Sequence, residues 1–262
     1  MSRIVEKGEV FFFYRPRVGL DEVRDLADVQ RFFFVIEPDA ARRFRRIVVG
    51  RKRLPDPLQH ERVWAYVAEV ADDPAQLRDE LERQTYETRT RGLRLQPEAR
   101  PAGEGRYAIV EHHRHSHLAY VLEIPREPGP AQLTFRILRE ASYVVAVRNP
   151  TVHVAPGAGL RPGRRATYPP ALLERFGERR FLPLDDPAFL DYVGTELVLI
   201  GAAADVDAEL DDDIGNDIGE GLREDDDLEA DEASLDNARI FLDLRIGPDE
   251  LPTEPLERGE LR

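Results

Sequence analysis

Continuous and alternating apolar runs fill much of residues 1–204 and predict β-strands. Val29–Glu37 reads VQRFFFVIE, and its unbroken apolar centre predicts a strand that is buried on both faces. Gly8–Val18 begins with the aromatic run FFFY, which favours a strand as far as Pro16. Further strands are predicted at Ile47–Gly50, Val63–Val70, Gln84–Arg91, Arg106–His112, His117–Ile124, Leu133–Leu138, Tyr143–Val147 and Glu196–Ile200.

Helical signals are fewer. Asp72–Arg83 offers an aspartate N-cap and a proline in the first turn, and Leu77 and Leu81 share one face because they are four residues apart. Two shorter helices are predicted from proline starts, at Pro170–Phe176 and Pro187–Tyr192.

Turns rather than helices separate most of the predicted strands, and this favours antiparallel pairing. We therefore expect residues 1–204 to form a β-rich α+β domain, with a mostly antiparallel sheet or sheets and two or three short helices. Residues 238–246 alternate and predict a strand that returns to the sheet. The apolar residues on one face of this strand are Ile240, Leu242, Leu244 and Ile246. The rest of residues 237–262 is predicted to be a loose C-terminal tail.

The net charge of −14 is unevenly distributed. Residues 205–236 contain sixteen acidic residues and one basic residue, Arg223, with no aromatic side chain. Such a segment buries too little apolar surface to offset its chain entropy, so we predict a disordered acidic insertion. Residues 1–204 are slightly basic, with 32 basic and 29 acidic residues.

The composition narrows the function classes. Cysteine is absent, which excludes disulfides, thiolate zinc sites and cysteine nucleophiles and suits a reducing cytoplasm. The longest apolar run, around Leu197–Ala204, falls short of the roughly 20 residues that a membrane helix needs, so we expect a soluble, cytoplasmic protein without a membrane partner. The phosphate-binding loop, the dinucleotide fingerprint, the serine-hydrolase elbow and the HExxH zinc motif are all absent from the sequence.

Four of the six histidines lie in Glu111–Leu118, EHHRHSHL, between two predicted strands, so they are expected at the turn of a β-hairpin. Imidazole nitrogens bind zinc at about 2.0–2.1 Å. In a regular strand His113, His115 and His117 share one face, with neighbours about 7 Å apart, so two could chelate and three would need a bend in the chain.

These three histidines are the candidate metal ligands, with a divalent ion such as zinc as the candidate cofactor. A further ligand would have to come from elsewhere, and Glu111, His153 or His60 could supply it. Two alternatives remain open: a solvated polar hairpin tip, and a pH-responsive or acid–base role.

The acidic segment also allows two interpretations. It could serve only as a solubilising loop. Alternatively, Asp205–Asp236 could act as a polyanion mimic that binds a basic protein partner or folds back onto the arginine-rich stretches Arg42–Arg46 and Arg51–Arg53. The net charge of +3 over residues 1–204 argues against a dedicated nucleic-acid binder.

The stretches FFFYRPRV, DVQRFFFVIEPD, GRKRLPDP and LDYVGTELVLIGA resemble a group of uncharacterised hypothetical proteins over most of residues 8–201. The resemblance favours one continuous domain and implies no activity, cofactor or site.

Three function classes therefore remain. We favour a binding or interaction module with an acidic regulatory or solubilising segment, because no catalytic motif is visible. The second class is an enzyme with a histidine-containing site, assembled from Tyr14, Arg15, Arg17, His115 and His117. The third is a polyanion binder that uses its arginines, which the acidic segment screens from the polyanion.

Overall fold

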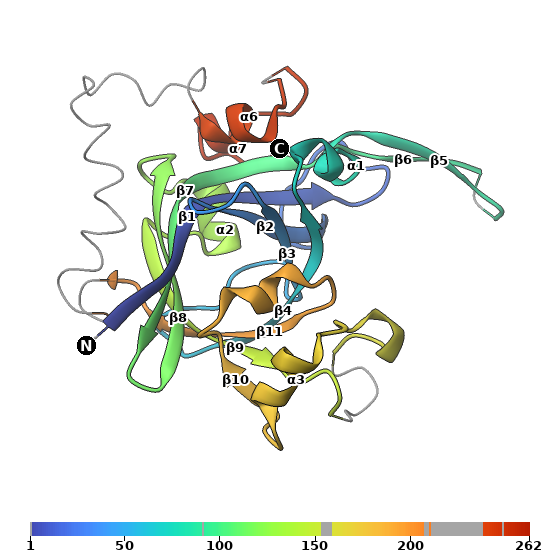
Figure 1. The fold of residues 1–262 in the computed structure, drawn as a ribbon. Coiled ribbons are helices and arrows are strands. Elements are labelled where there is room, and N and C mark those ends of the chain that lie inside the picture. The colour runs from blue at the N-terminus through green and yellow to red at the C-terminus, as the bar shows by residue number, and fades with distance from the viewer. Residues whose placement is uncertain (1, 91, 153–158, 207–209, 211–237, 248) are drawn as a thin grey trace.

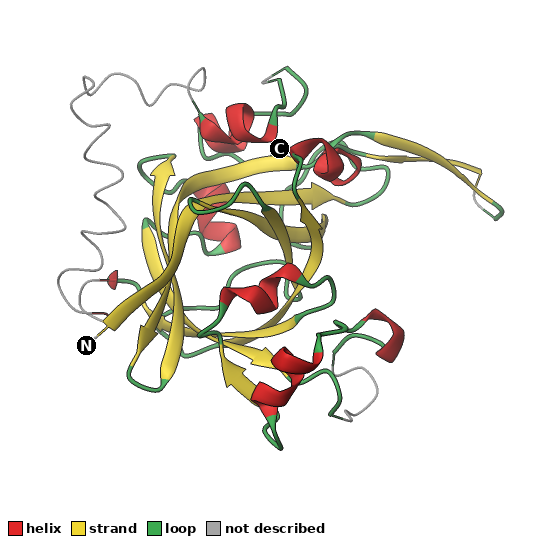
Figure 2. Ribbon diagram, in the orientation of Figure 1, coloured by secondary structure: helices red, strands yellow, loops and turns green. Residues whose placement is uncertain are grey.

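The computed structural model describes the whole chain except residues 1, 91, 153–158, 207–209, 211–237 and 248 (Figure 1). Eight antiparallel strands close into a barrel, which Figure 2 shows as a ring of strands. Around the ring the order is β1 (Ser2–Pro16), β2 (Val29–Pro38), β3 (Phe44–Val49), β4 (Arg62–Ala71), β11 (Glu196–Ala203), β9 (Glu140–Arg148), β8 (His115–Ile124) and β7 (Arg100–His112), which pairs with β1 again.

In the described part of the chain, three strands lie outside the ring. The short strand β10 (Phe181–Pro183) pairs with the end of β9. The hairpin of β5 (Gln84–Thr88) and β6 (Gly92–Gln96) forms a separate sheet that projects from the barrel as an arm (Figure 1).

The helices are short and connect or cover the strands. Among the described residues they are η1 (Pro74–Leu77), α1 (Arg78–Leu81), α2 (Pro130–Phe135), η2 (Pro162–Arg164), α3 (Pro170–Phe176), η3 (Pro187–Asp191), α6 (Arg239–Leu244) and α7 (Glu254–Glu257). Within the described part of the chain, no helix combines the length and the apolar character needed to cross a membrane.

The predicted α+β class is wrong, although the antiparallel pairing is correct. The sheet closes on itself because β8 pairs with both β7 and β9. The helices are too short to form a layer of their own. The fold is therefore a β-barrel with helical covers.

The predicted two-sided burial of Val29–Glu37 is confirmed. Phe32 and Phe34 of β2 point into the barrel, while Phe33 and Val35 point outward and are also buried. The predicted helix at Asp72–Arg83 exists as η1 followed by α1, and its capping aspartate is Asp73. The helices predicted at Pro170–Phe176 and Pro187–Tyr192 correspond to α3 and η3.

Aromatic side chains fill the barrel interior. Phe135 of α2 stacks on the rings of Tyr14 and Phe32, with centroids 4.7 and 5.1 Å apart. The strand predicted at Leu133–Leu138 is therefore wrong. The chain forms a helix there because Gly129 and Pro130 start a turn, in which the Gln132 side chain accepts a hydrogen bond from the Gly129 N–H.

The C-terminal segment covers the outward face of β1 and β2. Ile240, Phe241 and Leu244 of α6 and Leu256 of α7 pack in one cluster with the outward phenylalanines, so residues 249–262 are not a loose tail. The strand predicted at 238–246 is also wrong. Ile240, Phe241 and Leu244 match the helical period as well, and α6 buries these three while Leu242 is exposed.

The prediction of disorder for 205–236 falls almost entirely outside the described residues. Two described residues near the start of this segment, Val206 and Leu210, are buried. They pack on the outward face of β7 and β8, against Ala108, Val110 and Ala119. The division of the chain at 204 and 236 therefore stays a prediction.

We expect Phe135→Ala to destabilise the barrel by about 3–5 kcal/mol, because it leaves a cavity among buried rings. Leu133→Ala, on the same helix but 56% exposed, should change the free energy of unfolding by less than about 0.5 kcal/mol. Urea unfolding of both variants checks this, and equal losses would contradict the role of Phe135.

Candidate functional site

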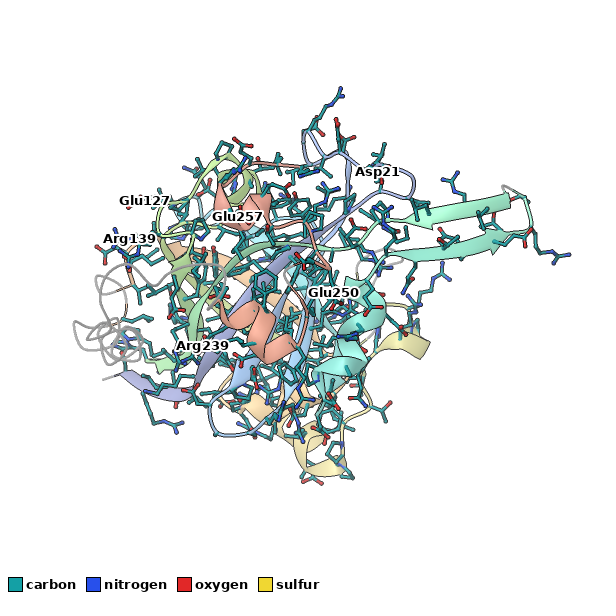
Figure 3. All side chains as sticks on the ribbon, turned by 90° about the horizontal axis from the view of Figure 1, so that it is seen from above. Asp21, Glu127, Arg139, Arg239, Glu250 and Glu257 are labelled. Atoms are coloured by element: carbon teal, nitrogen blue, oxygen red, sulfur yellow. The ribbon has the colours of Figure 1, made fainter. Side chains whose placement is uncertain are left out.

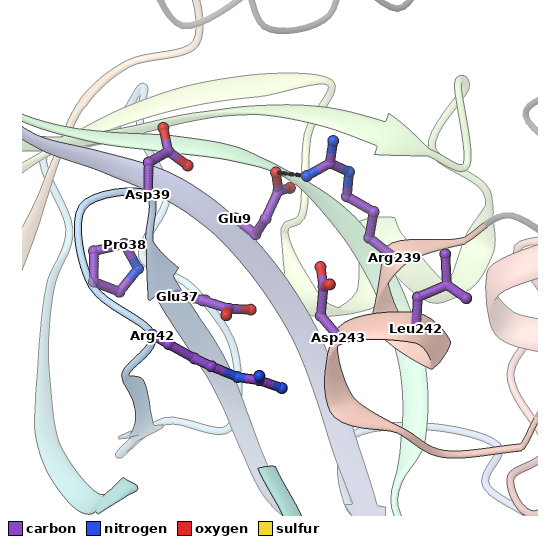
Figure 4. A pocket seen from close by; sticks show the side chains of 8 residues that line it. All are labelled: Glu9, Glu37, Pro38, Asp39, Arg42, Arg239, Leu242 and Asp243. Carbon is purple, nitrogen blue, oxygen red and sulfur yellow. Dashed lines mark hydrogen bonds and ion pairs between the residues drawn. The ribbon is translucent and has the colours of Figure 1, made fainter. Parts of the chain in front are cut away.

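A pocket of about 420 Å³ lies between α6 and the outward face of β1 and β2 (Figure 4). Four acidic residues and two basic residues line it, so its charge is unbalanced. The lining residues are Glu9, Glu37, Pro38, Asp39, Arg42, Arg239, Leu242 and Asp243.

Strand register places the central carboxylates. Glu9 of β1 lies opposite Glu37 of β2 on one side and opposite Arg106 of β7 on the other. All three point outward, because their neighbours Val10, Ile36 and Tyr107 belong to the interior core. Figure 4 shows the carboxylates of Glu37 and Asp243 directed toward the space between β2 and α6, while the Glu9 carboxylate is directed toward Arg239.

Hydrogen bonding leaves this cluster incompletely satisfied. Glu9 Oε1 accepts hydrogen bonds from Arg106 and, at 2.7 Å, from Arg239 Nη1. Glu9 is only 4% exposed, and its Oε2 is buried without a hydrogen-bond partner among the described residues. Glu37 Oε2 is in the same state. Burying a carboxylate oxygen without a hydrogen-bond donor costs free energy, so these two atoms call for an explanation.

The electrostatics agree with a shortage of positive charge. Burial, followed by repulsion from Asp243, raises the pKa of Glu37 from its ordinary value of 4.5 to about 7. Burial also raises the pKa of Glu9, against the attraction of Arg106 and Arg239. Asp243 on α6 likewise has a pKa raised by burial.

Two more carboxylates extend the cluster beyond the pocket. Glu104 of β7 accepts hydrogen bonds from the backbone N–H groups of Arg239 and Ile240, at 3.1 and 2.8 Å, and so caps the start of α6. Burial nevertheless raises the pKa of Glu104 to about 7. Burial, with repulsion from Glu9 and Glu104, raises the pKa of Glu123 on β8 to about 8.

The histidine hairpin forms as predicted, since His112 ends β7 and His115 begins β8. Its histidines face different surroundings. His117 is buried, and its Nδ1 lies 3.0 Å from Ser142 Oγ, whereas His113 and His115 are exposed. The ring nearest to His117 is that of His112, with centroids 5.9 Å apart.

The described residues contain no group of three or more His, Asp or Glu side chains arranged to hold a metal ion. Because Ser142 Oγ contacts Nδ1 of His117, Nε2 is the nitrogen of this buried ring that remains for a metal ion. Of the proposed additional ligands, Glu111 pairs with Arg3, His60 contacts the Gly201 carbonyl oxygen, and His153 lies outside the described residues. Metal binding at this hairpin stays a prediction.

The dispersed residues of the predicted enzyme site do not meet. Tyr14 lies in the barrel interior, and its hydroxyl group contacts the backbone of Arg262. Arg15 points outward and donates hydrogen bonds to the backbone carbonyls of Pro97, Glu80 and Glu82. The polar groups of Tyr14 and Arg15 are therefore used in contacts within the fold. His117 lies on β8, which pairs with β9, and contacts Ser142.

The arginine-rich stretches are largely neutralised within the fold. Arg45 is buried and pairs with Glu6 and Asp191. Arg51 and Arg53 both pair with Glu61, and their hydrogen bonds hold the pKa of Glu61 down at about 2. Arg43 and Arg46 also pair with carboxylates, and Arg42 lines the acidic pocket. Screening of these arginines by Asp205–Asp236 stays a prediction.

The sequence contained one signal for the pocket. Glu9 and Glu37 stand beside runs of residues that are buried on both faces, where a carboxylate is unexpected. Asp243 could not be related to them, because it lies more than 200 positions along the chain.

We expect Glu37→Gln to stabilise the protein at pH 8 by about 1 kcal/mol, after allowing for the solvent screening of a half-buried group. The folded state holds a proton on Glu37 that the unfolded chain loses, so this carboxyl group lowers stability as pH rises from about 4.5 to 7. The variant and the parent should have equal stability at pH 4. Urea unfolding at both pH values checks this, with the exposed Glu22→Gln as control, and a parent that is more stable at pH 8 would contradict it.

We expect His117 to stay neutral down to about pH 5. Burial, together with the neighbouring His112 and His115, lowers the pKa of His117 from 6.5 to about 4. Its imidazole resonances, assigned by comparison with His117→Ala, should not shift between pH 7.5 and 5 in an NMR titration. A midpoint near 6.5 would show that the ring is solvated.

Comparison of the chain with models of protein families, with curated proteins and with solved structures found no match in any of the three.

Proposed function

We propose that this protein is a binding module that takes an arginine side chain of a basic protein partner into the carboxylate pocket. The observation that carries the proposal is the pair of buried carboxylate oxygens, one on Glu9 and one on Glu37, that lack hydrogen-bond donors among the described residues.

A guanidinium group answers this deficit better than an ammonium group. Its donors form a planar fork that can bind two carboxylates at once, and it is less strongly hydrated. Glu9, Glu37 and Asp243 come from two strands and a helix and line the same pocket (Figure 4). The lining contains four acidic residues and only two basic residues, Arg42 and Arg239, so its formal charge is negative.

The pocket also suits the apolar part of an arginine side chain. Leu242, which is 61% exposed, and Pro38 belong to the lining. Methylene groups can pack on such surfaces while the charged end is bound. The pocket therefore fits an amphipathic cation better than a small metal ion.

The acidic segment directly precedes α6 in the chain, and its charge would assist this binding. It ends at Asp236, three positions before α6 begins at Arg239. A dense negative charge next to a binding site attracts cationic partners from a distance and speeds their association. This agrees with the basic partner expected from the sequence.

We expect a fluorescein-labelled tetra-arginine peptide to bind the full chain, and Glu9→Gln/Glu37→Gln to weaken that binding at least tenfold, or about 1.4 kcal/mol. Binding of the parent should strengthen from pH 6 to 8, because the cation must displace the proton that Glu37 holds. Fluorescence polarisation measures both effects.

The control variant is Glu22→Gln/Glu127→Gln, which removes the same charge from side chains that are 75% and 83% exposed. Figure 3 shows Glu127 at the periphery of the molecule, away from Arg239 of α6. Equal weakening by the pocket and control variants would mean that only net charge matters, and it would overturn the proposal.

A further inference from the structure

A second pocket, of about 450 Å³, lies on the outward face of β2, β3 and β4, and it shares no residue with the carboxylate pocket. Four arginines line it: Arg31 of β2, Arg46 of β3, Arg164 of η2 and the adjacent Arg165. Glu80 of α1 is the acidic residue in this lining. The charge of this pocket is therefore opposite to that of the first.

Carboxylates hold three of these arginines in place. Arg31 Nη1 lies 3.0 Å from Glu80 Oε2, and Arg46 Nε donates to Glu69 Oε2 at 3.1 Å. Arg165 Nε lies 3.6 Å from Glu196 Oε2, within ion-pair range. Arg164 is exposed and forms no ion pair with any described residue. The cluster thus keeps positive charge in excess.

Arg46 is the buried and fixed arginine of this pocket. Its side chain is 7% exposed, and its guanidinium group lies 5.5 Å from the centroid of the Phe33 ring. Its Nη1 lies 3.6 Å from Glu80 Oε2 and makes no hydrogen bond with a described residue. A buried guanidinium with a spare donor, fixed by an aromatic ring and a carboxylate, is preorganised to bind an anion.

We infer that this pocket binds the phosphoryl group of a small phosphate ester. Arg46 would contribute the fixed donor and Arg164 a free guanidinium group from the facing loop. A phosphoryl anion suits a lining in which four arginines outnumber Glu80 and Arg164 forms no ion pair with a described residue, and arginine forks match phosphoryl oxygens. The pocket extends beyond these groups over Tyr66, Leu160 and Val193, which offer apolar surface to the organic part of the ester.

The proposal is independent of the arginine-binding function, because the two pockets have different lining residues and opposite charge. Isothermal titration calorimetry of the full chain tests it with three probes: adenosine 5′-monophosphate, inorganic phosphate, and adenosine, which lacks the phosphoryl group. We expect the monophosphate to bind, adenosine to show no binding, and inorganic phosphate to compete with the monophosphate.

Arg164→Gln should weaken binding of the monophosphate at least fivefold. This side chain is exposed, so the variant should fold normally. The matched control is Arg139→Gln, which removes a cation that is 73% exposed and lies at the periphery of the molecule (Figure 3). It should bind like the parent.

Three results would overturn the inference. They are no detectable binding of either phosphoryl probe, equal binding of adenosine and its monophosphate, and an equal effect of Arg164→Gln and Arg139→Gln. Because Glu9→Gln/Glu37→Gln should leave phosphate binding intact, failure here can be distinguished from failure of the carboxylate pocket.

Discussion

The phenylalanine runs of β1 and β2 place apolar side chains on both faces of the same strands, and the rest of the architecture depends on burying both. Barrel closure and the plug formed by Phe135 bury the inward rings. The outward rings would face water without a second cover, and α6 and α7 provide it. The C-terminal helices are therefore required by residues near the start of the chain, and their position determines where the carboxylate pocket can form.

The two pockets illustrate how a packed barrel can carry function on its wall. Inward side chains fill the interior, so the groups available for chemistry are the outward ones and the segments that cross them. The carboxylate pocket forms where α6 lies beside outward carboxylates of β1 and β2. The arginine pocket forms where the loop that contains Arg164 lies beside outward residues of β2, β3 and β4. Each pocket retains a buried charged atom without a hydrogen bond, on Glu9 and on Arg46. Such atoms lower stability, and a ligand of opposite charge would relieve that cost.

Local patterns predicted local structure well and long-range structure poorly. Two-sided burial of VQRFFFVIE, the histidine hairpin and the helix at Pro170–Phe176 followed from neighbouring residues. Helix α6 did not, because its apolar residues fit two periods and its capping group, Glu104, lies 135 positions away. Barrel closure depends on the pairing of β8 with β9, which no local pattern encodes. The pocket brings together Glu9, Glu37 and Asp243, which are far apart in the chain. The sequence showed only that Glu9 and Glu37 are carboxylates beside buried runs.

Alternation along β1 ties the pocket to the core at the level of single residues. Val10 and Phe12 point inward, and Glu9 and Phe11 point outward. A one-residue insertion or deletion in this strand would exchange the two sets, sending a carboxylate into the interior and removing it from the pocket at once. The spacing between Glu9 and Phe12 in β1 therefore constrains both the carboxylate pocket and the core.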